Sequence, residues 1–570
     1  MKRQLKLFLG YLTVALFAST IISCDDYFNP DSDDELDASD YISSDTEMYT
    51  GFLGIMTKVQ AIGDKEILLT DTRGELLEIT DNASSELIAI YNYDDDLQGN
   101  SYANPAGYYE VIIACNDYLE KMVEYREQPG VDDDVWQDLV ASAVRVKAWT
   151  YKTIGEIYGK AVWFDSSVSK VTDITPENGF EEVDMAALVD KCLTLMDNGV
   201  EGVDVSRTIS WSDWLDPTGD LSTSEYRKWN WMVPPYEGVY AELCLWKGAV
   251  LDAQGADAEY YYKEAADALL SQLTYYADSK YMSSPSDPGS SVYWMPSAAT
   301  PGHYSSLWNY AQPYPFETVS AIIYDYTKNQ TNTLLEHFSN ESPNTYSLKP
   351  SEVGMNRYTD TSFSPGGSTS DARYSNCFGS NSGVSYIKKF RPVGSSVRTN
   401  AWQDDVHIYI YRATQYHTML AEALNHLNRF TAMNAVLNSG VKTGVYVDGA
   451  AEWEGFSRNW TSDAEWGTRK YPSEGLRGCY GLSDRSVKTS NKELGQQETW
   501  RYNDLAILDE IMLEFPCEGK TYAAMNRMAL RYDDLSIVAD RISPKYESSG
   551  KSAYVSGKIL AGGNYVPYDL

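Results

Sequence analysis

The pattern of apolar and polar positions is clearest between Trp136 and Asp165. In this stretch apolar or small residues recur every three or four positions, so they share one face of a helix; they are Leu139, Ala143, Val146, Thr150, Ile154 and Ile157. Carboxylates at 132–134 favour a helix start there, and Gly159 is typical of a helix end. The pattern predicts an amphipathic core helix over 136–158.

The same spacing predicts further helices before and after this one, and most of them come in pairs. The expected helices are 46–62, 107–125, 185–198, 231–253, 259–275, 408–427 and 431–437. Each pair is one helical-hairpin unit, and at least three stacked units are needed to bury a continuous core. The predicted fold class is therefore all-α, or at least α-rich.

Three long stretches interrupt the helical rhythm. They lie at about 63–105, 276–405 and 444–500, and they are rich in polar, glycine, proline and aromatic residues. Only 322–338 within the second stretch has a clear helical pattern. Long insertions in a compact protein are usually functional. We interpret all three as loop insertions in a single domain that covers 46–570.

The first 45 residues predict export and anchoring rather than folding. Residues 1–23 combine a basic start with an apolar run and end in Ile-Ile-Ser before Cys24, which is the pattern of a lipoprotein signal peptide. Lipid on Cys24 would anchor the protein to a membrane. Residues 24–45 are acidic and serine-rich, as in a flexible tether. No later run approaches the roughly 20 apolar residues that span a bilayer.

Charge and cysteine usage narrow the class of protein. The formal net charge is −36, which argues against nucleic-acid binding because a phosphate backbone requires a basic face. The six cysteines after Cys24 are scattered and form no C-x-x-C motif, so their pairing stays open. Three of them, Cys115, Cys192 and Cys244, lie in apolar helical runs and are expected to be buried free thiols.

Catalytic and metal motifs are not recognisable in the sequence. The five histidines form no H-E-x-x-H motif and no metal-ligand spacing, so no metal site and no cofactor are predicted. His417 lies on an apolar helix face, where a hydrogen-bonded core histidine is expected. Ser549 to Ser552 resembles the end of a phosphate loop, but Lys545 stands where that motif requires glycine. We predict that the protein is not an enzyme.

Several segments resemble the SusD/RagB family of outer-membrane nutrient-binding lipoproteins. The first is the helix at 136–158 with the step that follows it, which carries Arg145, Ala148, Trp149, Ile157, Tyr158, Gly159 and Trp163. A second is similar to a helix pair of the family and carries Tyr240, Leu243, Leu245, Trp246, Tyr262, Ala265 and Ala266. The most specific match is Arg412 followed by Ala421, Glu422, Ala423, Leu424 and Asn425. A last helix carries Glu510, Glu514, Glu518, Gly519, Asn526 and Arg527.

The resemblance covers nearly the whole mature chain but departs from the family pattern in places. Ile511 stands where the family has arginine, and the residues after Glu518-Gly519 match poorly. The resemblance implies a tetratricopeptide-like superhelix of helix pairs with long irregular loop insertions. It also implies lipid anchoring in the outer membrane, facing the exterior, and a TonB-dependent SusC-like transporter as partner. The matching residues belong to the scaffold and name no ligand.

Aromatic residues are the positive signal for a binding site, because they make up 13% of the chain. Sugar rings can stack on aromatic rings, while their hydroxyl groups need planar polar partners nearby. In the resembling family, ligand sites are built from the loop after the first helix and from the central insertion. The predicted ligand-binding residues are therefore Trp294, Trp308, Tyr304, Tyr293, Tyr310, Asp71, Arg73 and Asn82, with Trp453, Trp460 and Trp466 in reserve.

The function expected from these observations is capture of an oligosaccharide or polysaccharide, without turnover, for delivery to the transporter. The main alternative is binding of a peptide or another nutrient in the same complex. A peptide ligand would depend more on backbone hydrogen bonds and less on ring platforms. A surface glycoside hydrolase and a purely structural surface protein are further alternatives. The hydrolase would require two carboxylates at a defined separation, which a sequence does not give.

Overall fold

The computed structural model describes most of the chain from Ile42 onward. The described residues are 42–175, 178–211, 214, 229, 231–279, 318–325, 328–358, 373–390, 406–439, 450–456 and 498–568. The segment 1–41, with Cys24, lies outside them. No helix in the described part is both long and apolar enough to cross a bilayer.

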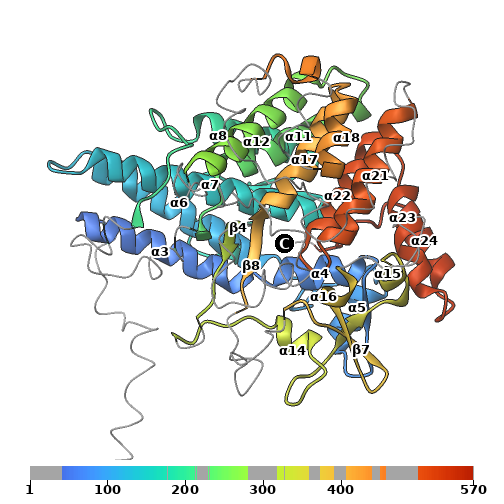
Figure 1. The fold of residues 1–570 in the computed structure, drawn as a ribbon. Coiled ribbons are helices and arrows are strands. Elements are labelled where there is room, and N and C mark those ends of the chain that lie inside the picture. Colours follow the sequence, from blue (N-terminus) through green and yellow to red (C-terminus); the bar gives the residue numbers. More distant parts are fainter. Residues whose placement is uncertain are drawn as a thin grey trace, which may run out of the picture.

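Helices dominate the described structure (Figure 1). The longer ones are α3 (Asp45–Ile62), α6 (Ala106–Arg126), α7 (Asp133–Tyr158), α8 (Met185–Asn198), α11 (Tyr236–Ala253), α12 (Glu259–Ser279), α17 (Ala413–His426), α18 (Phe430–Ser439), α21 (Glu498–Glu514) and α22 (Lys520–Tyr532). Shorter ones are α4 (Lys65–Arg73), α5 (Ser85–Tyr91), α14 (Leu334–Phe338), α15 (Glu352–Asn356), α16 (Tyr374–Cys377), α23 (Ser536–Ile542) and α24 (Ser552–Leu560). The prediction of a helix-rich fold is confirmed.

The described strands are short and form four two-stranded antiparallel sheets. The pairs are β1 (Leu77–Ile79) with β5 (Leu348–Pro350), β2 (Lys160–Trp163) with β3 (Glu181–Asp184), β4 (Thr318–Ile322) with β8 (Ile408–Arg412), and β6 (Phe378–Asn381) with β7 (Val384–Ile387). Short 3₁₀ helices occupy Val171–Asp173, Ala450–Trp453 and Ser543–Tyr546.

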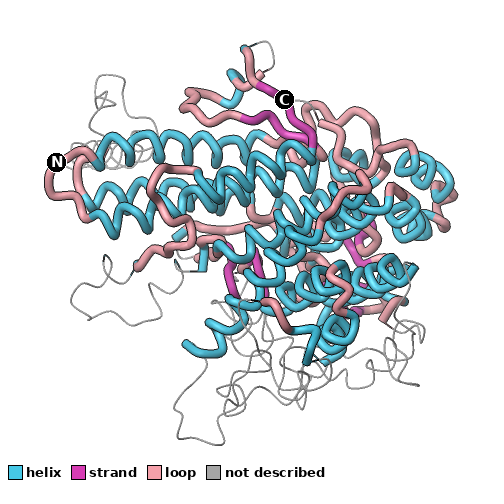
Figure 2. Tube along the Cα trace, turned by 90° about the horizontal axis from the view of Figure 1, so that it is seen from above, coloured by secondary structure: helices cyan, strands magenta, loops and turns pink. Residues whose placement is uncertain are grey.

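The helix pairs expected from the hydrophobic stripes pack side by side. They are formed by α3 with α6, α7 with α8, α11 with α12, and α17 with α18. Figure 2 shows long helices lying alongside one another. Helix α7 begins and ends as expected: the Asp132 side chain accepts hydrogen bonds from the amides of Asp134 and Val135, and Gly159 ends the helix at φ 72°. A left-handed residue at this point suits glycine because it has no Cβ.

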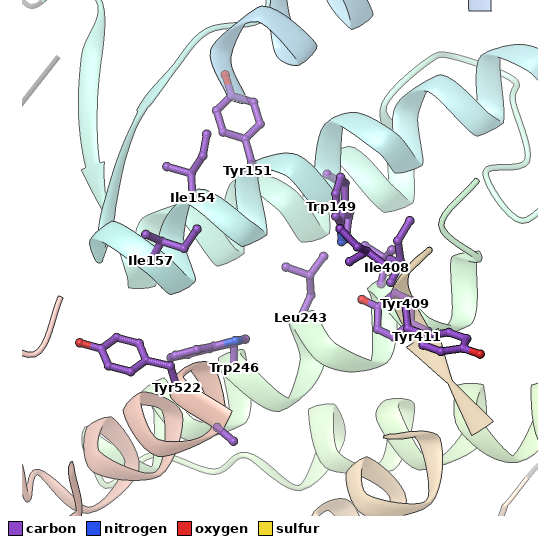
Figure 3. Packing of buried hydrophobic residues seen from close by; sticks show 14 of the residues in the cluster. Trp149, Tyr151, Ile154, Ile157, Leu243, Trp246, Ile408, Tyr409, Tyr411 and Tyr522 are labelled. Atoms are coloured by element: carbon purple, nitrogen blue, oxygen red, sulfur yellow. The ribbon is translucent and has the colours of Figure 1, made fainter. Parts of the chain in front are cut away.

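The core lies where α7, α11, β8 and α22 meet. Figure 3 shows buried residues of these four elements, namely Trp149, Ile154 and Ile157 of α7, Leu243 and Trp246 of α11, Tyr409 and Tyr411 of β8, and Tyr522 of α22. Trp246 and Leu243 are completely buried. Burying side chains of this size stabilises a fold by about 1.5–3 kcal/mol each. The three cysteines expected in helical runs, Cys115, Cys192 and Cys244, are indeed buried free thiols. His417 is also buried, and its Nδ1 donates a hydrogen bond to the Ala413 carbonyl at 2.7 Å.

Three predicted elements differ from the structure. The helix expected over 408–427 starts with strand β8, because alternating Ile and Tyr residues favour pairing with β4. The helix expected over 322–338 is reduced to α14, and Asn329 before it has a positive φ of 59° that a helix excludes. The stretch 63–105 is more ordered than a loop, since it contains α4, β1 and α5.

Buried ion pairs join the C-terminal helices to β8 and to residue 373. Arg412 donates to Glu518 at 2.9 Å and to Glu514 at 3.1 Å. Arg373 donates to Glu510 at 3.0 Å and to Glu514 at 2.6 Å. All five side chains are at most 3% exposed. Because an unpaired buried charge is strongly destabilising, these pairs fix how α21 sits against β8.

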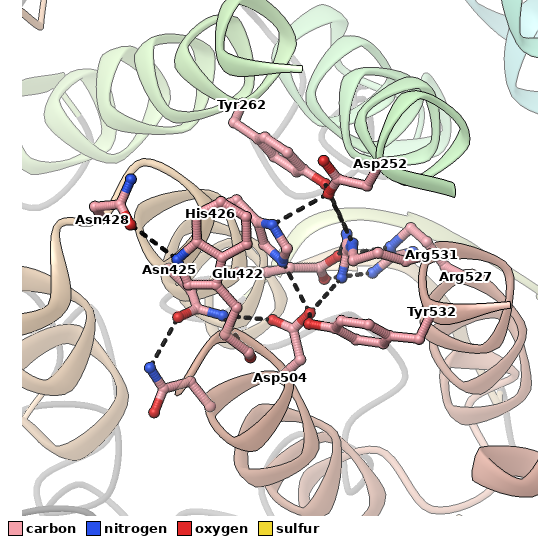
Figure 4. A network of polar contacts seen from close by, with 12 residues as sticks. Asp252, Tyr262, Glu422, Asn425, His426, Asn428, Asp504, Arg527, Arg531 and Tyr532 are labelled. Atoms are coloured by element: carbon pink, nitrogen blue, oxygen red, sulfur yellow. Dashed lines mark hydrogen bonds and ion pairs between the residues drawn. The ribbon is translucent and has the colours of Figure 1, made fainter. Parts of the chain in front are cut away.

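A second polar network connects α17 with α21 and α22 (Figure 4). Both Arg527 and Arg531 donate to Glu422, at distances from 2.6 to 2.9 Å. Asp504 accepts from Arg531 at 2.7 Å and from Asn425 at 2.8 Å. The residues of the most specific sequence match therefore act as buried structural contacts between helices that are far apart in sequence.

Candidate functional site

The structure places the sequence-predicted ligand residues in three different situations. The five aromatic residues Trp294, Trp308, Tyr304, Tyr293 and Tyr310 lie outside the described residues, as do Trp460 and Trp466. Asn82 is exposed in a turn, where its side-chain amide donates to the Thr345 carbonyl at 2.9 Å. Trp453 is completely buried, in a position that serves packing.

Asp71 and Arg73 lie in helix α4 and are 2% and 1% exposed. Asp71 accepts a hydrogen bond from the Gly519 amide at 2.9 Å. Burial raises the pKa of Asp71 to about 7, and the amide hydrogen bond only partly opposes this. The contacts of Asp71 are internal, so it supports the scaffold rather than offering an open surface.

Arg73 reaches the floor of a cavity of about 940 Å³, which we call the tyrosine cavity. The cavity is bounded by the segment after α5, the end of α7, strand β3, the end of α24 and the C-terminal segment. Its principal lining residues are Arg73, Tyr93, Asp94, Asp95, Asp96, Gln98, Tyr158, Gly159, Lys160, Glu182, Asp184, Lys558, Gly563, Tyr565 and Tyr568. The predicted loop at 63–105 thus supplies one wall.

Hydrogen bonds hold the C-terminal segment against α4 and the end of α7. The Val566 amide donates to the Ile157 carbonyl at 2.9 Å. Arg73 Nη2 donates to the Tyr565 carbonyl at 3.0 Å. Gly159 completes this wall, because a Cβ there would lie 2.6 Å from the Tyr565 ring. The sequence motif around Tyr158-Gly159 therefore shapes the cavity as well as ending the helix.

Arg73 carries a buried positive charge at the cavity floor. Its guanidinium lies 3.8 Å from the centre of the Tyr93 ring, and its Nε donates to the Tyr522 hydroxyl at 3.2 Å. Nη1 has no hydrogen-bond partner among the described residues. A cation stacked on an aromatic face is stabilised there even without a carboxylate partner.

The rim of the tyrosine cavity is mainly acidic. Five carboxylates contribute to it, namely Asp94, Asp95, Asp96, Glu182 and Asp184, against the two ammonium groups of Lys160 and Lys558. Both lysines are paired across the rim: Lys160 lies 3.0 Å from Glu182, and Lys558 contacts Asp95. Such a rim disfavours polyanionic ligands and offers many hydrogen-bond acceptors to a neutral one.

The cavity combines aromatic ring faces with planar polar groups. This combination is suited to binding a ligand by stacking and hydrogen bonding. Tyr565 and Tyr568 are half-buried, so part of each ring is accessible. Sequence reasoning missed both, although the short run Gly562 to Tyr568 is rich in glycine and tyrosine. In the described part of the chain, no three His, Cys, Asp or Glu side chains are placed to hold a metal ion.

Comparisons with known proteins identify the fold. No family model and no curated protein matches the sequence. Solved structures do match over nearly the whole chain. A SusD superfamily protein from Bacteroides vulgatus shares 10% identity at a TM-score of 0.57, over 92% of this chain and 95% of that one. NanU of B. fragilis shares 15% at 0.55, over 88% and 92% of the two chains.

A third similar structure is a laminarin binding SusD-like protein, with 12% identity and a TM-score of 0.52 over 88% of this chain and 94% of that one. These similarities extend over nearly the whole chain and define its class by fold. The fold of this chain is the SusD-like fold, as the sequence motifs indicated.

Proposed function

We propose that this protein is a cell-surface lipoprotein that binds an oligosaccharide or polysaccharide and delivers it, without turnover, to a TonB-dependent SusC-like transporter. The observation that carries the proposal is the tyrosine cavity, where half-buried rings stand beside carboxylates and an amide. The SusD-like fold supports it, and one solved structure of that fold is a laminarin binding protein.

The cavity chemistry favours a neutral glycan. The C–H faces of a sugar ring can stack on Tyr565 and Tyr568, while its hydroxyl groups donate to the rim carboxylates. An acidic glycan would meet those carboxylates and a chain with a net charge of −36. Binding alone suffices for the proposed role, because capture raises the local concentration of the nutrient and the transporter performs the uptake.

Anchoring at Cys24 explains how such a protein stays beside its transporter. The signal-like residues 1–23, the lipobox-like ending and the acidic tether fit attachment through lipid to the outer membrane. A Cys24→Ala variant should leave the membrane fraction and appear in the soluble fraction. Full retention of that variant in the membrane would refute lipid anchoring at this residue.

The binding proposal is tested by titrating the purified protein against plant, host and microbial polysaccharides by calorimetry. Tyr565→Ala and Tyr568→Ala should weaken binding, with Trp294→Ala and Trp308→Ala alongside to test the site expected from the sequence. The control is Tyr260→Ala, because Tyr260 is 61% exposed on α12 and lies outside the cavity.

Loss of binding in the cavity variants, without product formation, would support both the function and the site. Binding that survives in Tyr565→Ala and Tyr568→Ala but not in the tryptophan variants would move the site to the central insertion. Binding to no polysaccharide would refute the carbohydrate proposal and turn attention to peptides.

A further inference from the structure

A second cavity, of about 530 Å³, lies among the ends of five helices; we call it the His426 cavity. It is formed by the turn between α11 and α12, the end of α17, the start of α21 and the end of α22. The lining residues that matter here are Asp252, Tyr262, His426, Asn428, Trp500 and Arg531. It shares no lining residue with the tyrosine cavity.

Aromatic rings form one side of the His426 cavity. Tyr262 stacks on His426 with ring centres 4.5 Å apart and planes inclined by 21°. Trp500 leans on the same imidazole at 5.3 Å. The Trp500 indole donates to the Asn428 side-chain oxygen at 2.9 Å, so its orientation is fixed. Trp500 is only half-buried, which leaves part of the ring accessible at the cavity mouth.

The charges at the floor are satisfied inside the protein. Arg531 is paired with Asp504 at 2.7 Å and with Glu422 at 2.6 Å, and it is 3% exposed (Figure 4). Asp252 accepts from the Tyr262 hydroxyl at 2.5 Å. A ligand of opposite charge is therefore not needed to balance Arg531, and the cavity is no simple anion site.

His426 is held between two carboxylates at the floor of the cavity. It is 5% exposed, and its Nε2 contacts Asp504 at 2.9 Å. Its Nδ1 lies 3.2 Å from Asp252 Oδ2, and this contact is an ion pair when the imidazole is protonated. The imidazole is therefore fixed against the rings of Tyr262 and Trp500.

The cavity thus offers aromatic ring faces together with the exposed carboxylates of Asp257 and Glu259. This combination suits a ligand that is apolar on one face and rich in hydroxyl groups at its edge. The volume is within the range of about 300–1,000 Å³ that is typical of small-molecule sites. We propose that the His426 cavity is a second carbohydrate-binding site, which holds one end or branch of a neutral glycan against Trp500. This inference rests on the proposed function and adds a second point of attachment to it.

Two separate sites on one chain have a measurable consequence. A polysaccharide that spans both sites is held by multivalent attachment, so losing either site weakens its binding more than that of a short oligosaccharide. A short oligosaccharide fills each site independently. The stoichiometry of oligosaccharide binding should therefore be two per chain in the unaltered protein and one when the His426 cavity is disabled.

The test uses two variants that differ in how much of the cavity wall they remove. Trp500→Ala removes the ring. Asn428→Gly removes only the amide that fixes it, and glycine tolerates the positive φ of 58° at this position. The matched control is Tyr260→Ala, an exposed tyrosine on α12 that does not line the cavity. Melting temperatures establish that each variant is folded.

The polysaccharide retained best in affinity gels, and an oligosaccharide cut from it, serve as the probes. We expect both cavity variants to bind one oligosaccharide instead of two in calorimetry and to lose about tenfold or more in polysaccharide affinity, which corresponds to about 1.4 kcal/mol. Trp500→Phe should restore part of the loss because it restores a ring face.

Two results would overturn the inference in distinguishable ways. One oligosaccharide per unaltered chain, with Asn428→Gly equal to the control, would remove the second site and leave the proposed function intact. If the unaltered protein retains no carbohydrate at all, the proposed function fails and the second site fails with it.

Discussion

Gly159 is the residue at which the fold and the tyrosine cavity depend on each other most directly. In Gly159→Ala the backbone must keep a φ of 72°, and a left-handed conformation costs an L-residue about 1–2 kcal/mol. The new Cβ would also lie 2.6, 2.8 and 2.9 Å from three atoms of the Tyr565 ring. That ring cannot move freely, because the amide of the neighbouring Val566 donates a hydrogen bond to the Ile157 carbonyl and holds the backbone in place.

Crowding of this kind costs about 1–3 kcal/mol, so the total expected loss in unfolding free energy is about 2–5 kcal/mol. Gly202→Ala separates the two contributions. Gly202 has nearly the same φ, 75°, but no atom lies within 4 Å of the position that its Cβ would take, so only the backbone cost remains. Urea unfolding of both variants measures the difference between them.

Gly159→Ala should also bind carbohydrate more weakly, because the Tyr565 ring is displaced from the cavity wall. Gly202→Ala should bind as the unaltered protein does. Equal destabilisation of the two variants would show that Tyr565 yields without cost, and the account of the wall as a fixed structure would be wrong.

Three further predictions concern buried charges. Burial is the largest effect on the pKa of His426 and lowers it, but the Asp504 charge together with the contacts to Asp252 and Asp504 raises this pKa above its ordinary value. The stability that this gives is complete below about pH 6.5 and is lost as pH rises through the raised pKa. His426→Gln should therefore flatten the urea midpoint above about pH 6.5. Because burial raises the pKa of Asp71 to about 7, stability should fall between about pH 4 and pH 7, and Asp71→Asn should reduce that fall. Arg412→Met leaves Glu518 without one buried partner and should cost about 3–5 kcal/mol in urea unfolding.

The control for Arg412→Met is an arginine in a surface ion pair. Arg126→Met breaks an ion pair with Asp133 in which the side chains are 37% and 56% exposed, so it should cost less than about 1 kcal/mol. An Arg412→Met protein as stable as Arg126→Met would show that the buried network contributes no more than a surface pair. Unchanged pH profiles in His426→Gln and Asp71→Asn would refute the assigned shifts.

Hydrophobic periodicity predicted the helices because their buried stripes are continuous in the sequence. It failed at 408–412, where a strand of β-branched and aromatic residues joins directly onto a helix without a break in hydrophobicity. It also failed to show that Asp71 is internal, since a lone carboxylate in a polar stretch looks the same whether it faces solvent or the Gly519 amide just before α22.

The candidate site was predictable only in part. The sequence indicated that the stretch 63–105 contributes to a ligand site, and Arg73 within this stretch lines the tyrosine cavity. The opposite wall comes from Tyr565 and Tyr568 at the far end of the chain. No local pattern links these two segments, because their proximity results from hydrogen bonds between the C-terminal segment, α4 and the end of α7.

The positions that carry the family resemblance explain why it indicates a fold and not a ligand. Arg145 is completely buried and donates to the carbonyls of Val205 and Pro234, which fixes the segment before α11; burial lowers its pKa to about 10. Arg412 and Glu518 are paired in the interior in the same way. Such groups tolerate little change because each leaves an unpaired buried charge when its partner is lost. The rings of Tyr565 and Tyr568 bury no charge of this kind, so the scaffold can stay recognisable while rings that meet a ligand change.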